Sequence, residues 1–165
     1  MTNVMGFTVL DDDKNVYLVA DSQRTAIDYM QKGTVQKLFV AGNNAFASTG
    51  MSPYITSLSQ AVIELGDPTP KQAADKMLEI GKDLKLDRKN PDHRLETVLA
   101  GVEQIAGSKE RRPVLYHVFV SGGERLESGY FSVPTAFVGS GGSLVWGALQ
   151  RDMETSNIEV KDIIE

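Results

Sequence analysis

The chain has 165 residues, 41% of them hydrophobic, so it can bury one core without disulfides or a structural metal. It has no cysteine, which excludes thiolate catalysis and cysteine-based zinc sites, and no apolar run approaches the roughly 20 residues of a membrane helix. The net charge of −5 argues against a nucleic-acid partner, because such proteins usually present a basic face.

The N-terminal stretch combines a strand pattern with a threonine at position 2. Residues 2–10 and 16–20 are rich in β-formers, and the polar run at residues 11–15 predicts the turn of a hairpin. If Met1 is removed, Thr2 carries a hydroxyl nucleophile and a free α-amine, whose pKa of about 7.7–8.0 suits a general base. A hydroxyl activated by its own terminal amine is a recognised nucleophile. The residues alone leave open a plainer alternative, an ordinary strand that starts at threonine.

Residues 35–40 and 45–49 predict a second strand pair around the turn at residues 41–44, which makes four strands before any helix. Ser52 then predicts a helix N-cap, with proline at the first helical position and a stop at Gly66.

A second helix is expected from the capping box formed by Thr69 and Gln72, again with proline at its first position. Each helix carries one apolar stripe, so we expect a helical hairpin that covers a sheet.

The rest of the chain returns to strand character and then to helices. Strands are predicted at residues 95–102, 114–120, 125–131 and 136–138, and helices at residues 144–153 and from the capping box at 156–159. This order is not the alternation of a parallel α/β fold, so we expect two antiparallel sheets with helices outside.

Two other candidate features carry little chemistry. The glycine-rich turn at residues 139–143 could offer N–H groups to an anion, but it lacks the Gly-Lys-Ser/Thr ending of a P-loop. His93 and His117 have no carboxylate motif around them, so we expect packing or surface roles.

Five motifs in one order resemble the proteasome β-type peptidases. They are the first strand pair with Thr2, then Asp21-Ser22-Gln23-Arg24-Thr25, Gln36-Lys37-Leu38-Phe39, Ala47-Ser48-Thr49-Gly50 and Phe137-Val138-Gly139-Ser140-Gly141-Gly142-Ser143. The glycine turn is most similar to the peptidase subunit of the bacterial two-component ATP-dependent protease.

These peptidases belong to the N-terminal-nucleophile hydrolases. The resemblance implies an α+β fold, the four-layer αββα sandwich of two antiparallel sheets between helix layers, as a single domain over residues 1–165. The family continues with more helix and two strands after the helix near Ser156, so we expect a sandwich that lacks the last elements.

The resemblance also assigns a role to each residue of a candidate catalytic site. Thr2 is the expected nucleophile, the charge of Lys37 favours its alkoxide, and Asp21 keeps Lys37 charged. The backbone N–H of Gly50 faces the oxyanion, and Ser140 orients the terminal amine.

Substrate is expected to contact four further residues, namely Arg24, Thr25, Val35 and Ser48. The guanidinium of Arg24 predicts a modest preference for acidic side chains before the scissile bond, because arginine pairs bidentately with carboxylates.

Together these features predict a cytoplasmic threonine endopeptidase that cleaves peptides or unfolded proteins without a metal or organic cofactor. The resemblance further implies a homo-oligomer, possibly a ring with an ATPase partner, and we expect no nucleic-acid or membrane partner. Two alternatives stay open: a non-catalytic proteasome-like subunit that serves assembly, and an amidase or transpeptidase that uses the same nucleophile.

Overall fold

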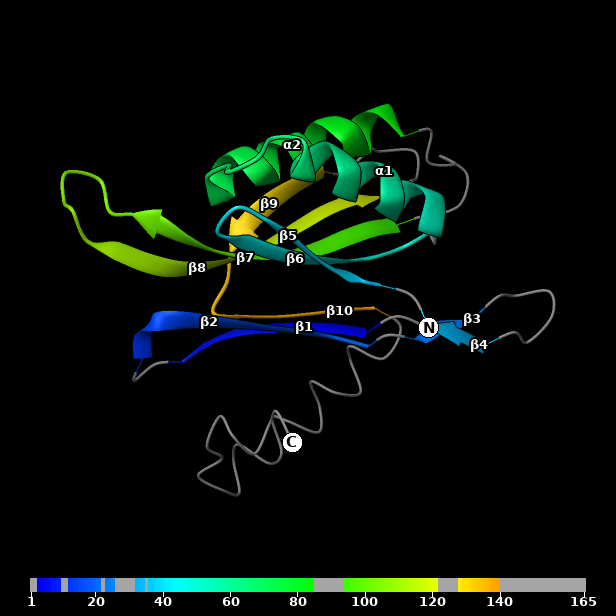
Figure 1. Cartoon of the computed structure of the whole chain (residues 1–165), viewed down its shortest axis with the longest axis horizontal. Coiled ribbons are helices and arrows are strands. Elements are labelled where there is room, and N and C mark those ends of the chain that lie inside the picture. The colour runs from blue at the N-terminus through cyan, green and yellow to red at the C-terminus, as the bar shows by residue number, and fades with distance from the viewer. Residues whose placement is uncertain are drawn as a thin grey trace, which may run out of the picture.

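The computed structural model describes residues 3–9, 12–21, 23–25, 32–34, 36–84, 94–121 and 128–139. Within these ranges the chain forms two face-to-face antiparallel sheets with two helices on one outer face, together with a small two-stranded sheet (Figure 1). The predicted α+β class and the antiparallel sheets are confirmed. The helices predicted at residues 144–153 and from residue 156 lie outside the described residues. Neither described helix combines the length and apolar character needed to cross a membrane.

The smaller of the two packed sheets has the order β10-β1-β2, with β1 at Asn3–Val9, β2 at Asp12–Ala20 and β10 at Thr135–Gly139. The central strand β1 therefore pairs with a strand from the other end of the described chain. The turn predicted at residues 11–15 is wrong. Val9 pairs with Asp12 while Thr8 pairs with Val16, so the polar run forms an irregularity inside β2.

The larger sheet has the order β5-β6-β7-β8-β9, and its strands are β5 Leu38–Ala41, β6 Asn44–Thr49, β7 Arg94–Gln104, β8 Arg111–Ser121 and β9 Ser128–Ser132. Alternate residues of the central strand β7 face opposite layers: Leu95 and Leu99 pack toward the helices, and Val98 packs toward the other sheet. Burial on both faces explains why β7 reads as an almost continuous apolar run.

A short two-stranded sheet that the sequence did not predict lies between β2 and β5 in chain order. It consists of β3 (Gln23–Thr25) and β4 (Lys32–Thr34), so six strands precede the first helix instead of four. Strands of three residues are too short to show the alternation by which strands are predicted.

The two helices are α1 (Ser52–Ile63) and α2 (Pro70–Asp83), and they form the predicted hairpin over the larger sheet (Figure 1). The capping box of α2 is present, because Thr69 and Gln72 exchange the expected hydrogen bonds. The start of α1 is one residue earlier than predicted: Met51 is the N-cap, and its side chain makes no capping hydrogen bond. Leu65, which precedes the predicted stop at Gly66, lies beyond the helix and is 43% exposed.

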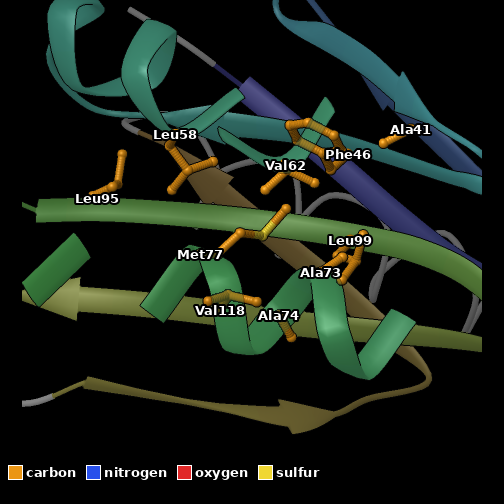
Figure 2. Close-up of a cluster of buried hydrophobic side chains, with 10 residues drawn as sticks. All are labelled: Ala41, Phe46, Leu58, Val62, Ala73, Ala74, Met77, Leu95, Leu99 and Val118. Carbon is orange, nitrogen blue, oxygen red and sulfur yellow. The ribbon is translucent and has the colours of Figure 1, made fainter. Parts of the chain in front are cut away.

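Two hydrophobic cores hold the layers together. Figure 2 shows the core between the helices and the larger sheet, where Met77 of α2, Leu58 and Val62 of α1, and Phe46 of β6 converge. The core between the sheets contains Val4, Ala47, Val98, Ala100, Leu115, Ala136 and Val138. Burying each large apolar side chain contributes about 1.5–3 kcal/mol. The packing of the two sheets places ends of their strands close together, and the candidate residues lie at these strand ends.

Candidate functional site

Three of the segments that carry candidate residues lie at one end of the smaller sheet. Asn3 at the start of β1 pairs with Gly139 at the end of β10. On its other side Asn3 accepts a bond from the backbone N–H of Asp21, which follows β2, at 3.1 Å. Asn3, Asp21 and Gly139 therefore lie side by side at one end of this sheet.

The larger sheet brings Lys37 and Gly50 to a common end as well. Leu38, the first residue of β5, pairs with Ala47 of β6. Lys37 precedes β5, so it lies beside the end of β6 that leads to Gly50. Because β5 begins at Leu38, the strand predicted from residue 35 starts later than expected.

An ion pair between Lys37 and Asp21 connects the ends of the two sheets. Lys37 Nζ donates to both carboxylate oxygens of Asp21, at 2.9 and 2.8 Å. The lysine side chain is 5% exposed and the aspartate side chain 30% exposed. Burial of an ammonium group costs free energy unless the group is paired and hydrogen-bonded. The two bonds to Asp21 offset this desolvation cost for Lys37.

Asp21 also fixes the beginning of the described chain. Its Oδ1 atom accepts the backbone N–H of Asn3 at 2.7 Å, while the same oxygen accepts Lys37 Nζ. Asn3 N is covalently attached to the carbonyl carbon of residue 2. The Lys37 ammonium and the Asn3 backbone N–H therefore bind the same oxygen atom of Asp21.

Thr2 and Ser140 themselves lie outside the described residues. Their neighbours Asn3 and Gly139 form a strand pair, so these two residues lie side by side at the same end of the smaller sheet. The structure therefore brings together Asp21, Lys37 and the chain positions next to Thr2 and Ser140.

Gly50 occupies a backbone conformation that requires glycine. Its φ of 139° is rarely adopted by L-residues, and an added Cβ would lie 2.8 Å from the carbonyl oxygen of Arg94. Gly50 is exposed and stands directly before Met51, the uncapped N-cap of α1, whose first turn contains no acidic residue. The partial positive charge of this helix end favours a negative group nearby.

Of the four residues predicted to contact substrate, the structure describes the side chain of Ser48. Ser48 is fully buried, and its hydroxyl lies 2.7 Å from that of Thr97. Arg24 and Thr25 belong to β3, opposite Gly33 and Lys32, but their side chains are outside the described part of the structure. Val35 is outside it too. A role in substrate binding stays a prediction for all four.

An apolar pocket of about 270 Å³ beside Asp21 was not foreseen from the sequence. It is lined by Asn3, Val4, Met5, Val19, Ala20, Asp21 and Phe137. The available signal was the apolar character of β1 and β2 on both faces, with Met5 and Val19 opposite one another. The described residues place no three His, Cys, Asp or Glu side chains in an arrangement that could hold a metal ion.

His117 lies in an aromatic environment. Its ring centroid is 5.4 Å from that of Phe131 and 6.0 Å from that of Phe119. Burial lowers the pKa of His117, an effect that nearby Glu96 partly opposes. The buried Nε2 atom has no hydrogen-bond partner within the described ranges. These features fit the packing role expected for this histidine, while His93 lies outside the described residues.

No protein-family model matches the chain, and no curated protein sequence matches it. The case for a catalytic site therefore rests on the sequence motifs and on the geometry around Asp21.

Proposed function

We propose that the protein is a threonine endopeptidase of the N-terminal-nucleophile hydrolase class, with the four-layer αββα fold of that class. Its nucleophile is Thr2 after removal of Met1. The observation that carries the proposal is the bonded series Lys37–Asp21–Asn3, because it holds a buried positive charge on the same carboxylate as the backbone N–H of Asn3, the residue that follows Thr2 in the chain.

The proposed reaction uses two chemical steps. The α-amine of Thr2 accepts the hydroxyl proton as Oγ1 attacks the substrate carbonyl, and the charge of Lys37 favours the alkoxide. The tetrahedral intermediate collapses to an ester on Thr2, and the protonated amine gives its proton to the departing peptide amine. Water then hydrolyses the ester by the same proton route, which restores Thr2.

The remaining candidate residues support charge and orientation in this reaction. The Gly50 N–H and the start of α1 favour the oxyanion, and one such donor is typically worth about 10²–10³ in rate. Asp21 holds Lys37 and the backbone N–H of Asn3 in fixed positions. This lowers the entropic cost of orienting these groups for the attack of Thr2 on the substrate carbonyl. Ser140 orients the amine. We further propose that Arg24, Thr25, Val35 and Ser48 shape the substrate site.

The proposal includes the setting in which the enzyme acts. The motif resemblance supports a cytoplasmic homo-oligomer that receives peptides or unfolded chains, with an ATPase partner supplying the latter. The non-catalytic alternative uses the same sandwich for assembly and predicts no covalent adduct at Thr2. The amidase or transpeptidase alternative shares the nucleophile and is separated by comparing peptide, amide and acyl-acceptor substrates.

Intact-mass spectrometry after incubation with a threonine-directed epoxyketone or β-lactone tests the proposal. We expect loss of Met1 and one covalent adduct in the wild type, and no adduct in Thr2→Ala. Thr8→Ala is the matched control, because Thr8 lies on the same strand and donates to the Pro134 carbonyl at 3.1 Å. The control should still form the adduct. Native protein that retains Met1 and forms no adduct would contradict the proposal and favour a non-catalytic subunit.

A further inference from the structure

The hairpin between β7 and β8 projects beyond the helices and the smaller sheet (Figure 1). We call residues 102–112 the hairpin arm. Its turn is fixed by its own bonds: Ile105 N–H donates to the Glu110 carbonyl at 2.9 Å, and Gln104 Nε2 donates to the Ser108 carbonyl at 2.8 Å. The arm nevertheless exposes apolar surface, since Val102 and Ile105 are 37% and 38% exposed. A fixed shape with exposed apolar side chains is suited to contact with another protein.

The charges at the end of the arm are mainly positive. Lys109, Arg111 and Arg112 are all exposed. Of the two acids on the arm, Glu110 is exposed, and Glu103 accepts the Tyr116 hydroxyl at 2.6 Å and lies 3.9 Å from Arg112. The side chain of Arg112 is still 65% exposed. The arm therefore presents cations beside an apolar surface.

The helix layer carries a groove of the opposite character. It has a volume of about 520 Å³ and is lined by Leu65, Asp67, Pro68, Gln72, Asp75, Lys76 and Glu79. The three acids outnumber the single lysine, Lys76, which pairs with Glu79 at 3.0 Å and leaves the Glu79 side chain 61% exposed. Leu65 adds exposed apolar surface at one end of the groove. The groove thus complements the arm in both charge and apolar character.

The arm and the groove lie at the same end of the molecule. The Pro68 carbonyl in the groove accepts Asn44 Nδ2 at 2.6 Å, and Asn44 packs against Gly101 at the base of the arm. A Cβ on Gly101 would also lie only 2.7 Å from Pro70 Cγ. Since both surfaces are at one end, two copies related by a two-fold axis can each place an arm in the groove of the other.

We propose that the chain forms a two-fold dimer in which the hairpin arm of each copy docks in the helix groove of its partner. The partner is a second copy because one end of the chain supplies both complementary surfaces. The contact is independent of the proposed peptidase activity. Exchange of two arms covers both apolar patches and pairs Arg111 with the acids of the groove.

Sedimentation velocity of the full chain with charge-reversal variants tests the dimer. We expect a dimer for the wild type and at least about tenfold weaker association for Arg111→Glu and for Glu79→Arg. An equimolar mixture of these two variants should restore the dimer, because both contacts of the mixed pair regain opposite charges. The double variant should restore it for the same reason. Lys82→Glu and Asp83→Arg, which reverse charges on α2 outside the groove, serve as controls and should leave the dimer intact.

Three outcomes would overturn the proposal. The first is a monomeric wild type at tens of micromolar protein, well above the range expected for a specific dimer. The second is an association state that both single variants leave the same as in the wild type. The third is failure of the mixture to restore association when both single variants keep the circular dichroism and melting temperature of the wild type.

Discussion

Lys37 places an ammonium group inside the protein, and the carboxylate of Asp21 lies within hydrogen-bonding distance of it through both oxygens. The same carboxylate accepts the Asn3 N–H, so one side chain satisfies a charge and a backbone donor. Removal of Asp21 affects both groups. The effect on folding can be separated from any effect on catalysis, because stability is measured without substrate.

We expect Asp21→Ala to lower the free energy of unfolding by about 3 kcal/mol, because it leaves the lysine charge buried without this partner. The double variant Asp21→Leu with Lys37→Met should lose less than Asp21→Ala, since no charge remains to be buried. Urea unfolding measures both values.

The control for this cycle is Lys76→Met, which breaks the exposed pair with Glu79 at 3.0 Å. Such a pair is worth less than about 1 kcal/mol. Equal losses for Asp21→Ala and Lys76→Met would show that burial gives the Lys37 pair no special weight.

At the scale of the secondary-structure elements, the two helices start in different ways. Thr69 caps α2 and Gln72 completes the box, whereas α1 begins at Met51 without a side-chain cap. The start of α2 is therefore fixed by local hydrogen bonds, and that of α1 by the chain that leaves β6 at Gly50.

Thr69→Ala should lower the free energy of unfolding by about 1 kcal/mol, the usual cost of losing an N-cap hydroxyl. Thr56→Ala is the matched control, because Thr56 donates only to the Ser52 carbonyl within α1. Its loss should stay below about 0.5 kcal/mol. Thermal or urea unfolding of both variants gives the comparison, and an equal loss would argue against the cap.

The helices were predictable because their signals are local. The capping box and the spacing of Ala73 and Met77 need no information from the rest of the chain. The polar run from Asp12 was misread as a turn because a strand irregularity and a loop share the same composition. The hairpin of β3 and β4 is too short to show a period.

The candidate site was predictable only in part. Asp21 and Lys37 stand out through motif order, but the bond from Asn3 to Asp21 depends on strand register, which the sequence does not state. The burial of Ser48 follows from its place one pleat from Phe46, on the face covered by helices. The sequence shows which residues of β6 share a face, but the side that the helices cover is known only from the packing of the layers.

For the molecule as a whole, stability is expected to be greatest at the centre of the larger sheet. β7 pairs with β6 on one side and along its full length with β8 on the other, and both of its faces are covered. Among the described strands, β5 and β9 each have one neighbour in that sheet.

Native-state hydrogen exchange should therefore show the slowest amides in the middle of β7, at Val98 and Leu99, with exchange limited by global unfolding. Amides of β9 that do not bond to β8 should exchange through local opening and at least about tenfold faster. Mass spectrometry with fragmentation resolves these strands. Faster exchange in β7 than in β9 would contradict this order of stability.

The layers of the sandwich also meet where a glycine leaves no room for a side chain. A Cβ on Gly6 would lie 2.7 Å from Val98 Cγ1, one on Gly81 would lie 2.5 Å from Val120 Cγ2, and one on Gly101 would lie 2.7 Å from Pro70 Cγ. Hydrostatic pressure unfolds proteins largely by eliminating internal voids. At these three points the space beside the glycine is already occupied, so these contacts contribute little to the volume change of unfolding, and compression gains little by separating them.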